Sequence, residues 1–172
     1  MRSHRPHGKY DYESQNPWFW IDLETTGLDT DTNLILEIVL VVTDSELREV
    51  DSMRLVLHHP HSILMARSSA WCRKRFCHRS EGGNCLFEAC HFSTLSHHEA
   101  EYRMWNFFDH YSKDASRRVV DVSTPLEMVR RWRPDLVSKL PRRNGNHRAY
   151  DDILDSIHLM KFFRETFLTP TF

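Results

Sequence analysis

The sequence has no long apolar run. No stretch approaches the roughly 18 apolar residues that a membrane-spanning helix needs, and residues 1–17 lack the apolar core of a secretory signal. Arg2, Arg5 and Lys9 stand without an acid in the first ten residues, which weakly resembles a transit peptide. We expect residues 1–16 to be a disordered tail and the protein to be soluble and intracellular, cytoplasmic or mitochondrial, with no membrane partner.

An excess of charge of either sign is also missing. The 23 Lys and Arg against 24 Asp and Glu give a net charge of −1, which excludes capture of long nucleic acids by the molecule's overall field. A short anionic substrate held by local charges remains open. The 172 residues are 40% hydrophobic and contain no internal repeat or low-complexity segment. This length and composition predict one α/β domain, placed at residues 17–168.

Three strands are predicted near the start of the domain. The aromatic and aliphatic run that begins at Trp18 predicts a buried strand, with Ile21 and Leu23 in the core. Residues 34–44 predict a second buried strand, and residues 53–59 alternate as a half-exposed strand would. These three strands are expected to form a meander.

Helical spacing of apolar residues dominates the rest of the chain. The predicted elements are a helix at 98–111 capped by Ser93 or Thr94, a strand at 118–124, a helix at 125–132 with Pro125 in its first turn, and a helix at 149–168. The last has the clearest apolar stripe. Following the predicted meander, these elements are those of an α/β fold.

Asp22 and Glu24 are the first candidate site residues. Residues i and i+2 of a strand point to the same face, so these two carboxylates project side by side from a largely apolar strand. Such a pair repels unless a cation lies between its members, and hard divalent cations such as Mg²⁺ and Mn²⁺ prefer carboxylate oxygen. The alternative is a chance pattern on an exposed strand.

A second acidic cluster lies near the end of the chain. His147 precedes Asp151 and Asp152 and is expected in a loop just before the last helix, from which it can turn back towards Asp152. That arrangement suits a carboxylate that binds metal and an imidazole that accepts a proton from attacking water. Separately, the residues are also compatible with an exposed loop histidine and with acids that stabilise a helix start.

Together these motifs resemble the oligoribonuclease family, whose exonuclease superfamily is named for an Asp-Glu-Asp-Asp-His site. The similarity rests, in chain order, on the segments WIDLETTGLD, ILEIVLVVTDSEL, RVVDVST, RRW and HRAYDDILDSIHLMKFFRETF. The resemblance implies an RNase H-like mixed β-sheet flanked by helices, partly truncated here. It also implies a homodimer that hydrolyses short single-stranded RNA from 3′ to 5′ down to mononucleotides, with two Mg²⁺ or Mn²⁺ ions per site.

The same resemblance implies roles for individual residues. Asp22, Glu24 and Asp152 correspond to metal ligands and His147 to the general base. Leu28 corresponds to an apolar wedge against the terminal bases. Arg118 and Ser123 match phosphate contacts that the partner subunit supplies, whereas Arg117 stands where the family has a tyrosine.

One family segment is not found in this sequence. The remaining metal-binding aspartate of the family belongs to a segment before RVVDVST, where only 15 residues, 103–117, stand here. Met104 falls where a metal ligand belongs, and Asp109 and Asp114, the two acids of this segment, could substitute only if the helix were rebuilt. The gap is either a true deletion or a defective gene model or splice form. The gap would remove one metal-binding aspartate. The alternative to an active nuclease is therefore a catalytically impaired homologue that only dimerises or binds short oligonucleotides.

The cysteines define a third possibility, a zinc-stabilised binding module. Cys72, Cys77, Cys85 and Cys90 are interleaved with His78, His91, His97 and His98. Their C-x4-C-x7-C-x4-C spacing lacks the short knuckles of zinc ribbons. Free thiols are the preferred interpretation in a chain with no export signal.

Overall fold

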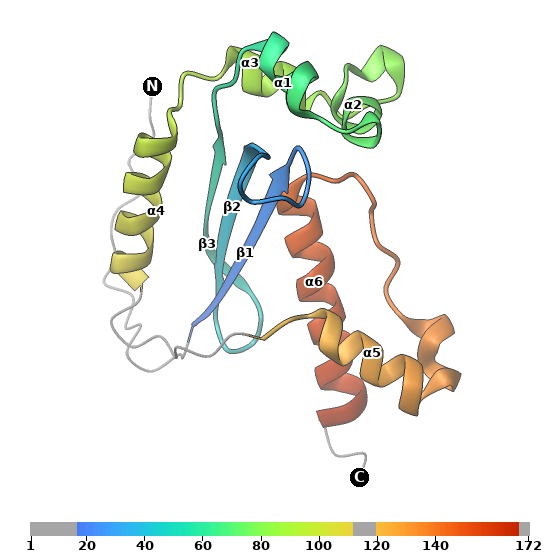
Figure 1. Ribbon diagram of the computed structural model, residues 1–172. Helices are drawn as coiled ribbons and strands as arrows, with labels where there is room; N and C mark the ends of the chain where they lie inside the picture. Colours follow the sequence, from blue (N-terminus) through green and yellow to red (C-terminus); the bar gives the residue numbers. More distant parts are fainter. Residues whose placement is uncertain (1–16, 112–119, 169–172) are drawn as a thin grey trace.

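The computed structural model describes residues 17–111 and 120–168 and confirms the mixed α/β class. Its sheet consists of β1 (Trp18–Thr25), β2 (Ile35–Thr43) and β3 (Glu49–Val56), antiparallel in the order β1-β2-β3 (Figure 1). The predicted meander is therefore confirmed, although β3 begins earlier and ends earlier than 53–59. β2 is central and almost wholly buried, as its β-branched, apolar sequence predicts.

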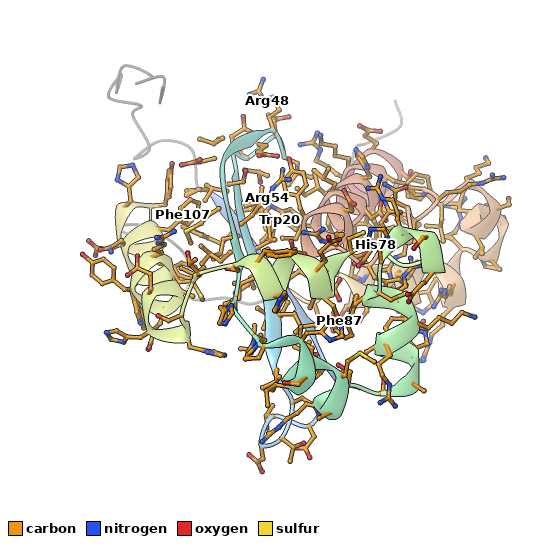
Figure 2. The ribbon with its side chains drawn as sticks, turned by 90° about the horizontal axis from the view of Figure 1, so that it is seen from above. Trp20, Arg48, Arg54, His78, Phe87 and Phe107 are labelled. Atoms are coloured by element: carbon orange, nitrogen blue, oxygen red, sulfur yellow. The ribbon has the colours of Figure 1, made fainter. Side chains whose placement is uncertain are left out.

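Helices cover both faces of the sheet (Figure 1). On one face α6 (Ala149–Phe163) packs Ile153 and Ile157 against Trp20 of β1 and against β2. On the other face α4 (His97–Tyr111) packs Ala100 and Phe107 against β2 and β3. In Figure 2, Phe107 lies on the α4 side, away from Trp20 and α6. The sheet is thus the middle layer between two amphipathic helices, and both helices were predicted.

The cap of α4 differs from the prediction. Ser96 is the capping residue, since its Oγ accepts a hydrogen bond from the Glu99 amide at 3.2 Å. Ser93 instead ends the preceding helix and donates its hydroxyl to the Val56 carbonyl at 2.6 Å.

Three short helices close the end of the sheet where β2 begins and β3 ends (Figure 1). They are α1 (His61–Arg67), α2 (Ala70–Phe76) and α3 (Leu86–Phe92), with the 3₁₀ turn η2 (Arg79–Glu81) between the last two. Phe76 and Phe87 pack with Leu36 of β2 in a separate apolar cluster. Phe87, a residue of α3, is labelled in Figure 2. This layer brings the α2–α3 loop towards the start of α6.

The C-terminal half is helical. It comprises α5 (Ser123–Trp132), the 3₁₀ segment η4 (Pro134–Lys139), α6, and a π-helical turn η5 (Arg164–Leu168) that continues α6. The predicted strand at 118–124 is wrong for its described part. Asp121 Oδ1 accepts from the Ser123 amide at 2.8 Å and thereby starts α5, and residues 120–122 pair with no strand. No helix within 17–111 or 120–168 is long and apolar enough to cross a membrane.

The prediction that Ile21 and Leu23 are buried is also wrong. Their side chains are 53% and 42% exposed, although they lie on the same face as the buried Leu40 and Ile38 beside them. β1 is an edge strand, and α4 covers mainly β2 and β3. Phe108 of α4 reaches only the start of β1, where its ring centroid lies 5.5 Å from that of Phe19.

Candidate active site

Asp22, Glu24 and Asp152 come together at the junction of β1 and α6. The two β1 carboxylates point to the α6 face of the sheet, as the period of two predicts. Asp152 lies in the first turn of α6, which begins beside the end of β1. One carboxylate oxygen from each residue lies within 4.8 Å of the others, and all three side chains are half-buried. The structure therefore unites two motifs that are 128 residues apart (152 − 24).

Burial and mutual repulsion disfavour three negative charges at this point. Burial raises the pKa of Asp22 to about 6, with the Asp152 and Glu37 charges contributing. Burial, followed by the charges of Asp152 and Asp22, raises the pKa of Glu24 to about 8. Burial also raises the pKa of Asp152. A cation among these oxygens would remove both penalties, because it replaces lost hydration and neutralises the repulsion.

A fourth acid, Glu37, lies directly opposite Glu24 on β2 and is paired with Arg148. Its side chain is almost fully buried and accepts a bidentate pair of hydrogen bonds from Arg148, at 2.6 and 3.0 Å. It also accepts from the Ala149 amide at 3.1 Å, so a β2 carboxylate caps the N-terminus of α6. This contact fixes where α6 begins and hence where Asp152 lies.

His147 lies in the loop before α6, as predicted. Its backbone has a φ of 49°, a left-handed conformation that is uncommon for a side chain of this size. Its ring meets Trp71 of α2 edge-on, with centroids 5.0 Å apart. Burial has the largest effect on the pKa of Asp152 and raises it, while His147 acts in the opposite direction and so lies within electrostatic range of this carboxylate. The strained backbone at this position is typical of a functional loop.

Asn84, from the α2–α3 loop, holds the His147 segment. Its Nδ2 donates to the carbonyls of Asn146 and His147 at 2.9 and 2.8 Å. Two further contacts tie the loop to α6: the Asn144 amide to Asp155 Oδ2 at 2.6 Å, and Asn146 Nδ2 to Asp151 Oδ2 at 3.2 Å. The loop is thus fixed on both sides.

Some predicted residues lie elsewhere. Leu28 is 99% exposed in the turn after β1. Ser123 starts α5, whose first turn lies against Met160 in the later half of α6, away from the carboxylates. Asp109 and Met104 belong to α4, which covers the opposite face from α6 (Figure 1), so neither joins the cluster. Arg118, Arg117 and Asp114 lie outside the described residues.

The four cysteines do not form one cluster. Cys72 and Cys90 are buried in the apolar layer of α1 to α3, whereas Cys77 and Cys85 lie in the loop that follows α2. All four are free thiols. Their placement therefore contradicts a single zinc site made of all four cysteines.

Glu37, Arg148 and Asn84 were missed by sequence reasoning. Glu37 carried a usable signal, since it is the only acid in the otherwise apolar run of β2 and needs a partner there. Asn84 carried none, because its role depends on a contact between loops 62 residues apart.

The geometry of the site indicates a class of protein. An α/β chain with three carboxylates between an edge strand and a helix start is compatible with a metal-dependent hydrolase.

No family model matches the chain. It is 30% identical to an oligoribonuclease of Marinobacter nauticus, over 86% of this chain and 94% of that protein. It is 32% identical to an oligoribonuclease of Pseudomonas savastanoi pv. phaseolicola, over 88% and 96%. The mitochondrial oligoribonuclease of Homo sapiens is 30% identical over 84% of this chain and 70% of that protein. The chain belongs to the oligoribonuclease family.

Proposed function

We propose that this protein is a 3′-to-5′ exoribonuclease that hydrolyses short single-stranded RNA to mononucleotides with two divalent metal ions per site. The observation that carries the proposal is the convergence of Asp22, Glu24 and Asp152. Family membership supports the substrate class, since the relatives are named oligoribonucleases, some of them mitochondrial. Cytoplasm or mitochondrion is accordingly the proposed location.

The donor set fits Mg²⁺ or Mn²⁺. All three groups are carboxylates, the oxygen ligands that these hard cations prefer, and the raised pKa values mark a site that a cation would stabilise. Bound there, a divalent ion supplies Lewis-acid activation of water and of the phosphodiester. The carboxylates would hold it against the end of β1, while the nearby Glu37 carboxylate is paired with Arg148.

His147 is the proposed general base. The electrostatic effect of His147 on Asp152 supports this role, in which a ring nitrogen of the neutral form would accept the proton of the attacking water. Asn84 and Trp71 restrict the loop and the ring, so the base starts near a productive orientation. The new bond from the water oxygen to phosphorus would form as the bond from phosphorus to the 3′ oxygen of the preceding nucleotide breaks. That leaving oxygen would take a proton from solvent, and His147 would return its proton to solvent.

The proposed substrate contacts come from two subunits. Leu28 presents an apolar side chain, 99% exposed, that would lie against the terminal bases. Arg143 lies near enough to lower the pKa values of Asp22 and Asp152, and is placed to attract a phosphate. Arg118 and Ser123 are proposed to contact phosphate in the partner's site. Ser123 lies away from its own carboxylates, which is compatible with a homodimer. An RNase H-like domain over 17–168 is proposed for each subunit.

A direct test is hydrolysis of a 5′-labelled RNA dinucleotide by the purified protein with Mn²⁺ or Mg²⁺. The proposal expects metal-dependent release of mononucleotide that is lost in Asp22→Ala and reduced by about 10² or more in His147→Ala. A DNA dinucleotide in parallel gives the sugar preference. Absence of turnover by a folded protein would contradict the proposal.

One observation favours a second function. Within the described ranges the cluster has three carboxylates, and Asp109 lies on the opposite face of the sheet. A homologue short of one ligand would retain the fold and bind short RNA without hydrolysing it. A dinucleotide that binds stoichiometrically and stays intact with Mn²⁺ would support this alternative.

A further inference from the structure

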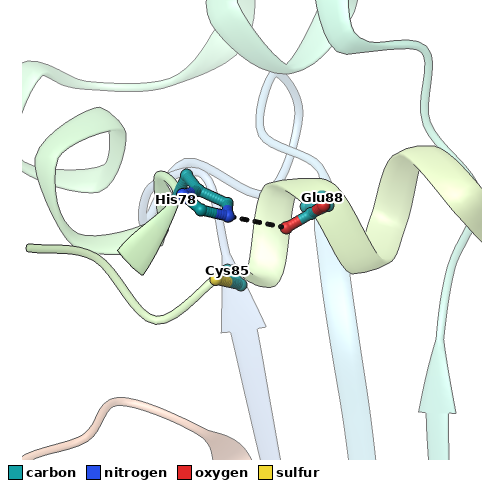
Figure 3. A group of neighbouring side chains, drawn as sticks. All are labelled: His78, Cys85 and Glu88. Atoms are coloured by element: carbon teal, nitrogen blue, oxygen red, sulfur yellow. Dashed lines mark ion pairs between the residues drawn. The ribbon is translucent and has the colours of Figure 1, made fainter. Parts of the chain in front are cut away.

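A second group of metal-binding side chains lies in the loop between α2 and α3. It consists of His78, Cys85 and Glu88, which point toward one another (Figure 3). One donor atom of each lies within 4.8 Å of the others, and His78 Nε2 is 3.7 Å from Glu88 Oε2. We propose that these three residues bind a zinc-class transition metal ion, with water completing the coordination.

The donor set differs in kind from that of the carboxylate cluster. A thiolate and an imidazole favour zinc or cobalt over Mg²⁺ and Mn²⁺, which prefer oxygen. In a tetrahedral zinc site, neighbouring N and O ligands are about 3.4 Å apart, given metal–ligand distances of about 2.1 Å. The observed 3.7 Å between His78 and Glu88 is close to that value. Metal binding would draw these two donors together by about 0.3 Å and bring the Cys85 Sγ, already within 4.8 Å of both, to the same ion.

His78 is already oriented for this role. Its Nδ1 lies 2.8 Å from Ser80 Oγ, which leaves Nε2 facing Glu88 and Cys85. Nδ1 also accepts a hydrogen bond from the Ser80 amide at 3.2 Å, so without metal the ring proton lies on Nε2. Metal binding at Nε2 would move that proton to Nδ1, which would then donate to Ser80 Oγ in place of accepting from the amide. A second partner that fixes the tautomer in this way is common for metal-bound histidines.

Cys85 is held by the backbone at the start of α3. Its amide donates to the Cys77 carbonyl at 2.9 Å, and it has a φ of 64°. Glu88 follows three residues later, on the same side of the first turn of α3. Binding would replace the thiol proton of Cys85 by the metal and release that proton to solvent.

The ion would join η2 to α3 and so close the loop from His78 to Glu88. Three donors from a loop of 11 residues (88 − 78 + 1) restrict it as a short cross-link would. This site would be structural, because it lies on a different layer from Asp22, Glu24 and Asp152. Its existence does not depend on the nuclease activity.

Cobalt titration of the metal-free full-length protein tests the proposal. With excess Mg²⁺ present to occupy the carboxylates, Co²⁺ is expected to produce a thiolate-to-cobalt absorption band that saturates at one equivalent. Zn²⁺ should then displace the cobalt and abolish the band. No such band in a protein that circular dichroism shows to be folded would overturn the proposal.

Variants assign the ligands. Cys85→Ser should eliminate the band, and His78→Gln and Glu88→Gln should each weaken Zn²⁺ binding by at least about 10-fold. Cys77→Ser is the matched control, since this thiol lies in the same loop but outside the group. A band that survives in Cys85→Ser, or that disappears in Cys77→Ser, would overturn the assignment.

Discussion

Arg148 and Glu37 form a bidentate ion pair between residues that are 111 positions apart. Glu37 is 2% exposed, and it also accepts a hydrogen bond from the first amide of α6. Because β2 pairs directly with β1, this contact sets the start of α6 against the strand that carries Asp22 and Glu24. The geometry of the carboxylate cluster thus depends on a neighbouring pair that takes no part in it.

Arg148→Ala is expected to lower the free energy of unfolding by about 3 kcal/mol, because it leaves a buried carboxylate without its cation. Urea denaturation near neutral pH measures the effect. Arg130→Ala is the matched control: its pair with Glu127 is exposed, so about 0.5 kcal/mol or less is expected. Equal losses in the two variants would contradict a structural role for the Glu37 pair.

The stability of the metal-free protein should fall as the pH rises from about 4.5 to about 8. The pKa of Glu24 is raised from 4.5 to about 8, so in this window the folded state holds a proton that the unfolded state has released. Stability from this proton is complete below the unfolded pKa and is lost through the folded pKa. Mn²⁺ binds the deprotonated form, so its stabilising effect should grow over the same window.

Thermal unfolding across that pH range, with and without Mn²⁺, measures both effects. Glu24→Gln should reduce the slope of the metal-free curve, whereas Glu101→Gln, on the exposed side of α4, should retain it. A slope that Glu24→Gln leaves unchanged would rule out Glu24 as its source.

Asn84→Asp tests whether the contact between loops positions His147. The substitution keeps the side-chain oxygen that accepts from the Leu86 amide but removes the donor to the Asn146 and His147 carbonyls. We expect kcat to fall by about 10-fold with little change in KM. Asn106→Asp is the control, since Asn106 Nδ2 donates to the Tyr102 carbonyl within the exposed part of α4. Unchanged kcat would mean that the loop keeps its position without Asn84.

Leu28→Ser tests the apolar contact with the bases. The side chain is 99% exposed, so the free energy of unfolding should change by less than about 0.5 kcal/mol. Loss of an apolar contact on the substrate should raise KM for an RNA dinucleotide by about 10-fold. Phe92, at the end of α3, is also an exposed apolar residue, and Phe92→Ser should leave KM unchanged. A KM that does not respond to Leu28→Ser would assign base contact to other residues.

The parts predicted correctly from sequence depend on local spacing. The strand β2 and the helix α6 each carry a dense apolar pattern of the appropriate period. Asp22 and Glu24 share a face because residues i and i+2 of a strand always do. Asp152 joins them because it stands in the first turn of a helix that packs on that same face.

The errors concern contacts that local spacing does not encode. Ile21 and Leu23 are apolar enough for a core, but their exposure follows from the position of β1 at the sheet edge. The run at 118–124 has a β-branched composition, yet the Asp121 side chain starts a helix at Ser123. Composition is a weak guide where no neighbouring strand provides pairing.

The second metal-binding group shows the same limit. The sequence drew attention to cysteine and histidine but gave no reason to include Glu88, which looks like any exposed acid in a helix. In the folded chain, one cysteine and one histidine of these candidates, Cys85 and His78, lie close to the Glu88 carboxylate.

Calorimetric titration of Mn²⁺ into the metal-free protein is the most direct test of the central claim, that Asp22, Glu24 and Asp152 form a divalent-metal site. We predict saturable Mn²⁺ binding that Glu24→Gln and Asp152→Asn each weaken by at least about 10-fold. Asp109→Asn, on the opposite face of the sheet, should bind Mn²⁺ as the wild type does. No binding by the folded wild-type protein, or equal affinity in all three variants, would contradict the account.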